Sequence, residues 1–231
     1  MVVALDGTRL LTDPVLRRTI VHLRRAAPVP RGAFAGVDGV LISHSHFDHL
    51  DLPSLARLDR SVRLVVPRGA GSLVRRRGFG HVDEVEEGDE VELGTLRVRA
   101  VHADHDAARR PLGVRAQPVG YVVRGSRSVY FAGDTDLFPG MDELRPVDVA
   151  LLPVAGWGPT LPPGHLNPVS AAEALVLIRP TLAVPVHWGT FRTPLAAAPG
   201  DAAPREFERA AAELAPDVEV RLLQIGESCA L

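Results

Sequence analysis

A six-residue run, HSHFDH at positions 44–49, restricts what this chain can fold into more than any other segment. It holds three of the nine histidines of the 231-residue chain, together with one aspartate. Imidazole and carboxylate side chains form the ligand mixture that suits zinc and its first-row neighbours. Alternate side chains of an extended segment share one side, so His44 and His46 can bind the same ion. Asp48 and His49 follow where the chain turns and can reach a second ion, so the run predicts much of a two-metal site.

Composition is that of an ordinary globular chain. Hydrophobic residues make up 46% and charged residues 23% of a 24.8 kDa chain, so we expect one domain that spans residues 1–231. No apolar run approaches the ~18 residues of a membrane span, and the first residues do not resemble a signal peptide. The single cysteine, Cys229, excludes an internal disulfide. We therefore expect a protein of the reducing cytoplasm.

Charge and the choice of basic residues exclude other functions. The net charge of −2 gives no general attraction to nucleic acid. All 26 basic residues are arginine, and the chain has no lysine. Schiff-base chemistry and a P-loop nucleotide site both require a lysine, so neither is available. A small-molecule substrate is the expected partner, and the oligomeric state stays open.

Short β-rich runs alternate with helical stretches along the chain, which predicts a layered α/β fold. The expected strands are residues 37–43, 62–66, 90–103 (two strands joined at Gly94), 119–124, 128–132, 147–154, 182–186 and 218–225. The expected helices are one that begins after Asp51, residues 72–77, residues 168–178 after the cap residue Asn167, and residues 204–214.

Residues that suit metal binding stand repeatedly where an expected strand ends. They are His44, His105, Asp134 and His187. Side chains from several strand ends that meet at one rim are the usual way in which a layered α/β fold builds a site. The pattern predicts that these distant segments come together.

Four motifs give the chain a family resemblance. They are HSHFDH followed by Leu50-Asp51, the Ala-x-His run at 103–105, YFAGDT at 130–135 and PVHWGTF at 185–191. Together they resemble the signature of the metallo-β-lactamase-fold hydrolases. Within that superfamily the chain is most similar to the branch of N-acyl-phosphatidylethanolamine phospholipase D-like enzymes and ascorbate-6-phosphate lactonases. The resemblance implies an α/β fold, the four-layer αββα sandwich of the metallo-β-lactamase fold.

The resemblance also implies a complete set of metal ligands. The first ion would be held by His44, His46 and His105, the second by Asp48, His49 and His187, and both would be bridged by Asp134. A carboxylate can bridge because it has two oxygens. The cofactors would be two divalent metal ions, with Zn²⁺ favoured by the imidazole-rich set and Mn²⁺, Fe²⁺ or Ni²⁺ also suited to it.

The third histidine of the first position has an alternative. His102 lies three residues before His105, and either side chain could complete the site. The family's Ala-x-His pattern favours His105, as do Asp106 and Arg109-Arg110, which follow it. His102 would then lie at the surface or behind the ligands.

His165 is the residue for which the resemblance implies chemistry rather than metal binding. In the resembled branch, a histidine just before an Asn-Pro helix start faces the metals and contacts the substrate. His165, in PPGHLNP, occupies that place, so we expect it to stabilise developing negative charge. A loop histidine without a role is the alternative. Asp48 would orient the nucleophile and carry its proton to the leaving group.

The expected function is a two-metal-dependent hydrolase that uses a metal-bridging hydroxide on a phosphodiester or on a lactone or other ester. A nuclease of the same fold would need a basic surface or a nucleic-acid-binding domain, and neither is visible. A non-catalytic metal-binding or sensing domain is a further alternative. The apparently complete ligand set argues against it.

Two more expectations concern the rim of the site and the first strand. Trp157, Trp188 and Phe191 either line the pocket or pack in the core or at its rim. Chains of the resembled family usually open with a strand that carries a Gly-His-Ala-Thr-like run before the segment that matches residues 5–14. Met1 lies only a few residues before that segment, so we expect either a shortened first strand or a start inside a longer chain.

Overall fold

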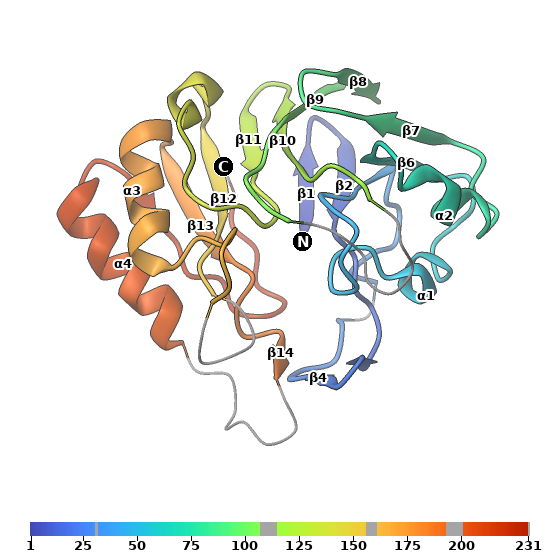
Figure 1. Cartoon of the computed structure of the whole chain (residues 1–231), viewed down its shortest axis with the longest axis horizontal. Coiled ribbons are helices and arrows are strands. Elements are labelled where there is room, and N and C mark those ends of the chain that lie inside the picture. Colours follow the sequence, from blue (N-terminus) through green and yellow to red (C-terminus); the bar gives the residue numbers. More distant parts are fainter. Residues whose placement is uncertain (31, 107–114, 156–160, 193–200, 231) are drawn as a thin grey trace.

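Two β-sheets lie face to face in the middle of the molecule, and helices cover the outer side of each sheet (Figure 1). The structure, a computed structural model, describes residues 1–30, 32–106, 115–155, 161–192 and 201–230. In this described part of the chain, no helix is both long and apolar enough to cross a bilayer.

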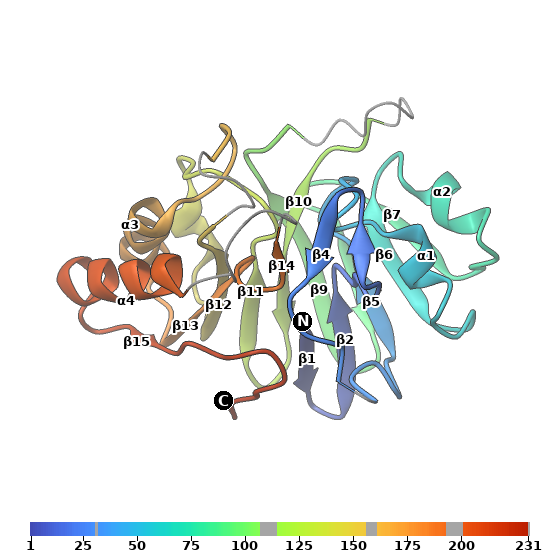
Figure 2. The ribbon, with the colours of Figure 1, turned by 90° about the horizontal axis from the view of Figure 1, so that it is seen from below.

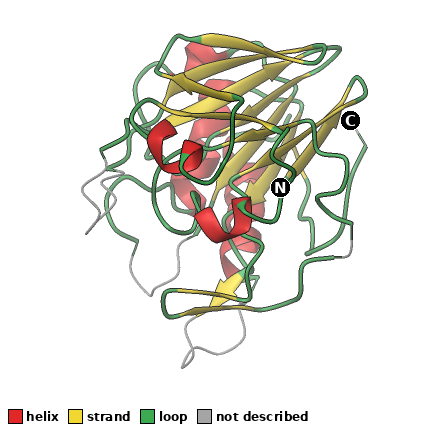
Figure 3. Ribbon diagram, turned by 90° about the vertical axis from the view of Figure 1, so that its right-hand side faces the viewer, coloured by secondary structure: helices red, strands yellow, loops and turns green. Residues whose placement is uncertain are grey.

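The first sheet has five strands and is mainly parallel. In spatial order they are β1 (Val2–Leu5), β2 (Thr8–Thr12), β5 (Gly39–Leu41), β6 (Arg63–Pro67) and β7 (Val82–Val85). β1 and β2 form an antiparallel hairpin, while β2, β5, β6 and β7 pair in parallel. The short helices α1 (Leu52–Leu55) and α2 (Gly71–Arg75) follow β5 and β6. They lie in front of the sheets in Figure 3.

The second sheet has seven strands in the order β15, β13, β12, β11, β10, β9, β8. Its antiparallel half consists of β8 (Glu90–Leu93), β9 (Leu96–His102), β10 (Val119–Arg124) and β11 (Ser128–Phe131). Its parallel half adds β12 (Val149–Pro153), β13 (Leu182–Val186) and β15 (Glu219–Val220). The segments between these parallel strands contain the 3₁₀ helix η1 (Met141–Leu144) and the helices α3 (Pro168–Ile178) and α4 (Ala202–Leu214).

Three apolar layers hold these elements together. Side chains of a strand alternate between its two faces, and β11 shows the result. Val129 and Phe131 pack between the two sheets, whereas Tyr130 packs against α3 and α4 on the outer side. A third layer joins α1 and α2 to the outer face of the first sheet. The predicted four-layer αββα sandwich is therefore confirmed.

A buried tyrosine side chain forms a hydrogen bond between the two sheets. The side chain of Tyr121 on β10 is fully buried, and its hydroxyl donates to the carbonyl of Ile42 at 2.7 Å. Burial raises the pKa of Tyr121, so the hydroxyl keeps its proton and remains a donor. Ile42 directly follows β5, two residues before His44. The bond thus ties the second sheet to the start of the HSHFDH run.

A third, small sheet lies beside the two large ones. It consists of β3 (Thr19–Ile20), β4 (Leu23–Arg25) and β14 (Phe191–Arg192), and β14 lies next to β4 in Figures 1 and 2. Phe191 pairs with Arg25, so the segment after β13 returns to the N-terminal part of the chain. Strands of two or three residues leave no periodic pattern in a sequence, and none of the three was predicted.

Several predicted boundaries agree with the structure. The hairpin expected at 119–124 and 128–132 forms β10 and β11. The helix expected after Asn167 is α3, and the side chain of Asn167 accepts hydrogen bonds from the backbone N–H groups of Val169 and Ser170. This capping removes two of the unpaired donors at a helix start, which is why asparagine marks it in the sequence.

The predicted last strand, residues 218–225, is wrong in extent. Only Glu219 and Val220 pair with β13. Along this edge of β13, the carbonyls of Thr181 and Ala183 accept from β15 and the segment after it. The next donor on the same edge would be the N–H of Pro185, which proline lacks, so the ladder stops there.

Candidate metal centre

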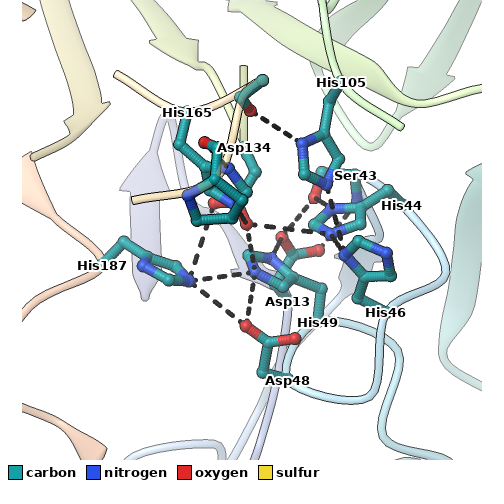
Figure 4. A network of polar contacts seen from close by, with 12 residues as sticks. Asp13, Ser43, His44, His46, Asp48, His49, His105, Asp134, His165 and His187 are labelled. Atoms are coloured by element: carbon teal, nitrogen blue, oxygen red, sulfur yellow. Dashed lines mark hydrogen bonds and ion pairs between the residues drawn. The ribbon is translucent and has the colours of Figure 1, made fainter. Parts of the chain in front are cut away.

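The predicted metal ligands follow the carboxyl ends of strands in both large sheets. In the first sheet β2 and β5 run in parallel. In the second sheet β9 and β11 both pair antiparallel with β10, so they point the same way, and β12 and β13 continue that direction. The loops after these strands therefore meet at one rim of the sandwich. Figure 4 shows their side chains converging there.

The HSHFDH run leaves β5 and closes into a turn before α1. The backbone N–H groups of His49 and Leu50 donate to the carbonyl of His46 at 3.1 and 2.8 Å. Leu50 is fully buried and anchors the turn in the core. Asp51 then caps α1 by accepting from the backbone N–H of Ser54. The turn is therefore held at both ends, which fixes the backbone that carries the three histidines.

His44, His46 and His105 form the first group of possible ligands. Nδ1 of His46 lies 3.0 Å from Nε2 of His44 and 3.2 Å from Nε2 of His105. His44 is fully buried, and the other two are partly exposed. Three ring nitrogens from two loops thus face one another.

Asp48, His49, Asp134 and His187 form the second group. Nε2 of His49 lies 3.2 Å from Nε2 of His187 and 3.1 Å from a carboxylate oxygen of Asp48. His187 Nε2 is 3.3 Å from the same oxygen of Asp48. The group therefore joins the HSHFDH run of the first sheet to the ends of β11 and β13 in the second.

Asp134 lies between the two groups and is almost completely buried. Its Oδ2 atom is 3.1 Å from Nε2 of His49 and 3.8 Å from Nε2 of His44. Its Oδ1 atom has no hydrogen-bond partner among the described residues, and Nε2 of His187 lies 3.6 Å away. Buried carboxylate oxygens normally have hydrogen-bond partners or coordinate metal ions. Asp134 therefore has the position and the free oxygen that a bridging ligand needs.

Four of the five histidines are held through the ring nitrogen that faces away from the centre. Nδ1 of His49 lies 2.7 Å from Asp13, and Nδ1 of His44 lies 3.0 Å from the hydroxyl of Ser43. Nδ1 of His105 and of His187 each lie 2.7 Å from a backbone carbonyl, those of Gly164 and Ala155. Such bonds fix the ring orientation and leave Nε2 as the free lone pair. His46 instead presents Nδ1 to the group.

Asp13 contributes to the site, although the sequence did not identify it as a site residue. It follows β2, its side chain bonds His49, and it accepts the backbone N–H of Ser43 at 2.8 Å. Asp13 has a φ of +39° and His187 a φ of +60°, a region that side-chain-bearing residues rarely adopt. Such strain is found where the surrounding structure enforces a functional geometry. Asp13 lies in the segment of residues 5–14, and the family match of that segment is the sequence signal that could have pointed to it.

Hydrogen bonds between loops bring His105, Asp134 and His165 together. The hydroxyl of Thr135, next to Asp134, accepts from the backbone N–H of Asp104, next to His105. The carbonyl of Thr135 accepts from the N–H of Leu166. Three loops are thus fastened through one residue.

Gly164 completes this junction for a steric reason. Its φ of +82° is strained for other residues, and a Cβ there would lie 3.1 Å from Nδ1 of His105. The close approach of the loop to the ring therefore requires glycine.

Burial and charge shift the pKa values of these groups. Burial raises the pKa of Asp134, but His187 and His49 outweigh it and hold that pKa well below its usual value. Burial lowers the pKa of His187, but the charge of Asp134 and the contact with Asp48 raise it to about 9. Burial and the neighbouring His49 hold the pKa of His44 well below its usual value. The carboxylates therefore need positive charge close by, from protonated imidazoles or from cations.

The spacing of the nitrogens suits tetrahedral zinc. Zn–N bonds of about 2.0–2.1 Å give a tetrahedron whose edge is roughly 3.3 Å. The facing nitrogens of His44 and His46 lie 3.0 Å apart, and those of His49 and His187 lie 3.2 Å apart. Two neutral imidazole lone pairs repel at this distance unless a proton or a cation lies between them. The residues of both groups thus fit a metal-binding role.

His165 lies at the edge of the centre, and His102 lies away from it. Nε2 of His165 is 3.5 Å from Oδ2 of Asp134, and Nδ1 is 3.1 Å from the carbonyl of Pro162. Nδ1 of His102 is 2.9 Å from a carboxylate oxygen of Glu87, and this pair is exposed. The structure therefore brings His105 and not His102 into the first group.

A cleft of about 1200 Å³ runs from the centre between the two sheets. Asp48, His49, Asp134 and His187 line it together with apolar residues of the sheets. Trp188 and Phe191 also line it, and Trp188 packs partly against the core. Trp157, for which a pocket or core position was expected, lies outside the described residues, as do Arg109 and Arg110.

Comparison with known proteins agrees with the fold and the motifs. Residues 8–188 match the family model of the beta-lactamase superfamily domain. A UPF0173 protein of Pyrococcus furiosus is 32% identical over 205 residues, which cover 88% of this chain and 82% of that protein. A UPF0173 metal-dependent hydrolase of Methanopyrus kandleri is 36% identical over 234 residues, which cover 98% of this chain and 94% of that protein.

A solved structure supports the same family. A metallo hydrolase of Ignicoccus hospitalis superimposes with a TM-score of 0.74 at 26% identity, over 98% of this chain and 91% of that chain. The predicted metallo-β-lactamase fold is thereby confirmed. The finer placement, in the phospholipase D-like and lactonase branch, stays a prediction.

Proposed function

The chain belongs to the beta-lactamase superfamily, and on this premise we propose that it is a metal-dependent hydrolase that binds two divalent cations. One observation carries the proposal. A group of three and a group of four possible ligand side chains converge from two sheets, and Asp134, one of the four, lies between the histidines of the two groups. The donor set favours zinc.

The proposal assigns each of the possible ligands to one or both of the two cations. His44, His46 and His105 would hold one cation, Asp48, His49 and His187 would hold the other, and Asp134 would serve both. The assignment is supported by the outer hydrogen bonds of His44, His49, His105 and His187. Ligand histidines in metal sites are oriented in this way, because a ring fixed through one nitrogen presents the other to the ion.

Two divalent cations at such a centre lower the pKa of water and polarise a carbonyl or phosphoryl oxygen. The chain itself has to orient the reactants and move protons. Burial raises the pKa of Asp48, but His49 and His187 outweigh it, so the carboxylate is ionised. Asp48 lines the cleft and can orient a nucleophilic water and accept its proton.

His165 supplies the opposite function, the donation of a proton or a hydrogen bond. Burial lowers its pKa, but its contact with Asp134 outweighs burial and raises the pKa above the usual value. A protonated imidazole at the edge of the centre can donate to negative charge that develops on the substrate. The proposed substrates are small phosphodiesters and lactones or other esters.

Metal analysis and an activity panel test the proposal. Protein purified without added metal is loaded with zinc, and its bound zinc is counted by mass spectrometry. Bis(4-nitrophenyl) phosphate, 4-nitrophenyl esters and simple lactones form the panel. We expect about two zinc ions per chain, as a two-metal centre requires, and hydrolysis that chelation abolishes and zinc restores.

Asp134→Ala and His102→Ala serve as matched variants. Asp134→Ala should lose activity, whereas His102→Ala, at the surface beside Glu87, should keep it. Saturation at one zinc ion contradicts the two-metal centre. Two bound ions without turnover of any panel member favour the non-catalytic alternative.

A further inference from the structure

Arg25, at the end of β4, has a guanidinium group that is held in place without a carboxylate. Its Nε atom donates to the carbonyl of Arg17 at 3.2 Å, and Nη2 donates to the carbonyl of Val15. The guanidinium carbon lies 4.7 Å from the centre of the Phe191 ring, a cation–π contact. A guanidinium has five N–H donors, so the two carbonyls leave three without a partner among the described residues.

The neighbouring Arg17 pairs with a carboxylate, and Arg25 does not pair with one among the described residues. Arg17 makes a two-point contact with the carboxylate of Asp51, at 2.9 and 2.6 Å. No carboxylate oxygen of the described residues lies within 4.0 Å of the Arg25 guanidinium. The residues outside the described ranges include no aspartate or glutamate, and their one carboxylate is that of the terminal residue Leu231.

The lack of a counter-ion for Arg25 among the described residues costs free energy of folding. Arg25 is only partly exposed, and burial lowers the pKa of its guanidinium. A charge withdrawn from water without an opposite charge is unfavourable. Folding thus leaves a half-buried cation with part of its hydrogen-bonding capacity free.

The position of Arg25 connects it to the metal centre. Val15 lies two residues after Asp13, which holds His49, and Phe191 lies four residues after His187. Both segments that hold the guanidinium therefore start at the centre. Arg25 lines the same cleft as His49 and His187.

Arg24 provides the contrast on the same strand. Successive side chains of a strand point to opposite faces. Arg24 is exposed and lines a separate pocket of about 240 Å³ with Thr19 and Arg192. Only Arg25 of this pair faces the cleft that leads to the centre.

We propose that Arg25 binds an anionic group of the substrate, a carboxylate or a phosphate, at a distance from the bond that is cleaved. The planar fork of arginine matches both groups through paired N–H···O bonds. An anion there would replace the missing counter-ion and use the free donors. This inference rests on the proposed function, because the metal centre is taken as the place of reaction. It narrows the substrates to esters that carry a carboxylate or phosphate group, and to phosphodiesters that carry such a group besides the diester itself.

Calorimetric titration of the zinc-loaded protein tests binding without turnover. The probes are α,ω-dicarboxylates from glutarate to azelate, and the controls are monocarboxylates of the same chain length. A monocarboxylate can contact the metal centre or Arg25 but not both at once, whereas a dicarboxylate of suitable length can contact both. We expect at least one dicarboxylate to bind on the order of 10- to 100-fold more tightly than its monocarboxylate, the gain typical of a charge-assisted pair.

Three variants locate this preference. Arg25→Gln keeps an N–H donor for the carbonyl of Arg17 but removes the charge, so it should abolish the preference and leave binding of monocarboxylates at the metal centre unchanged. Arg25→Lys keeps the charge without the fork and should keep part of the preference. Arg24→Ala should behave like the wild type. A preference that is absent in the wild type, or intact in Arg25→Gln, overturns the proposal.

Two further experiments show which anion Arg25 binds and separate the proposed anion site from the proposed hydrolase activity. Replacing the far carboxylate by a phosphonate, as in 4-phosphonobutyrate against glutarate, shows which anion Arg25 prefers. In the kinetic arm, the 4-nitrophenyl monoester of glutarate should have a lower KM than 4-nitrophenyl valerate, and Arg25→Gln should remove this difference. If both esters are hydrolysed equally and no dicarboxylate preference exists, Arg25 has no such role although the hydrolase proposal stands. If neither these esters nor any phosphodiester or lactone of the panel is hydrolysed but the binding preference depends on Arg25, the anion site stands and the hydrolase proposal fails.

Discussion

Oδ2 of Asp13 lies 2.7 Å from Nδ1 of His49, on the side of the ring that faces away from the metal centre. The other oxygen of the same carboxylate accepts the backbone N–H of Ser43 at 2.8 Å. The hydroxyl of Ser43 in turn lies 3.0 Å from Nδ1 of His44. One aspartate thus orients an imidazole in each of the two groups of possible ligands, directly in one group and through a serine in the other.

Replacing Asp13 by asparagine should therefore weaken zinc binding without removing a ligand. The amide keeps the shape but loses the charge and one acceptor, so His49 is less firmly held. We expect a loss of affinity of about 10- to 100-fold, the usual effect of a group that orients a metal ligand. Competition with a chromophoric chelator measures it. Asp38→Asn is the control, because Asp38 accepts a backbone N–H of Arg9 at the surface. Equal affinities of the two variants would show that Asp13 does not orient the centre.

Asp134→Ala should cost more activity than the loss of any single histidine. Only Asp134 is proposed to contact both cations, and its oxygens lie 3.1 Å from His49 and 3.6 Å from His187. Turnover of the same substrate is compared with that of His44→Ala at matched metal occupancy. A smaller loss in Asp134→Ala than in His44→Ala would argue against the bridging position.

His105 and His102 give a paired test of the first group. His105→Ala should weaken zinc binding by at least about 10-fold, because it removes a proposed ligand. His102→Ala should leave the affinity unchanged, since that ring contacts Glu87 at the surface. Zinc titration of both variants is the measurement. If His102→Ala weakens zinc binding and His105→Ala does not, His102 is the ligand and the Ala-x-His match lies three residues too late in the chain.

His165→Ala should lower kcat on the order of 100-fold, the usual contribution of a positioned acid or hydrogen-bond donor. Metal content should stay at the wild-type level, because His165 is not among the proposed ligands. Steady-state kinetics with elemental analysis of the same sample separates the two effects. Loss of zinc together with activity would identify His165 as a ligand instead.

The metal-free protein should lose stability as the pH rises from 6.5 to 9. The contacts of His187 with Asp134 and Asp48 raise its pKa in the folded chain to about 9 from 6.5 in the unfolded chain. A raised histidine pKa stabilises the fold fully below the unfolded value, and this contribution disappears as the pH passes the folded value. The free energy of unfolding should fall by on the order of 3 kcal/mol across this range.

Urea unfolding of chelator-treated protein at several pH values measures this change. Zinc-loaded protein should lack the decline, because the cation replaces the proton on His187. The affinity for zinc should rise over the same range, since the competing proton is lost. A flat stability profile of the metal-free protein would show that His187 does not hold this proton.

The sequence could point to candidate ligands because their chemistry belongs to side-chain identity and spacing. His44, His46, Asp48 and His49 stand in one run, and Asp134 stands in a motif of its own. The alternation of apolar residues also predicted most strands, as for β10 and β11. Their roles as ligands stay predictions until metal binding is measured.

The groups behind the ligands could not be predicted in the same way. His105 and His187 are oriented by the carbonyls of Gly164 and Ala155, and every residue has a carbonyl. Only the folded chain shows which carbonyl lies within reach. The end of β15 was missed for a related reason, because it depends on Pro185 of the neighbouring strand rather than on its own residues.

The hydrogen bond from Tyr121 to Ile42 has a mechanical consequence for the centre. His44, His46 and His49 follow a strand of one sheet, and Asp134 and His187 follow strands of the other. A shear of one sheet past the other by a single residue, roughly 3.3 Å, would be as large as the 3.1 Å gap between Asp134 and His49. Tyr121 resists that shear from the dry interior, 2.7 Å from Ile42. The position of Asp134 relative to His49 thus depends on the alignment of the sheets in the interior, where the side chain of Tyr121 is fully buried.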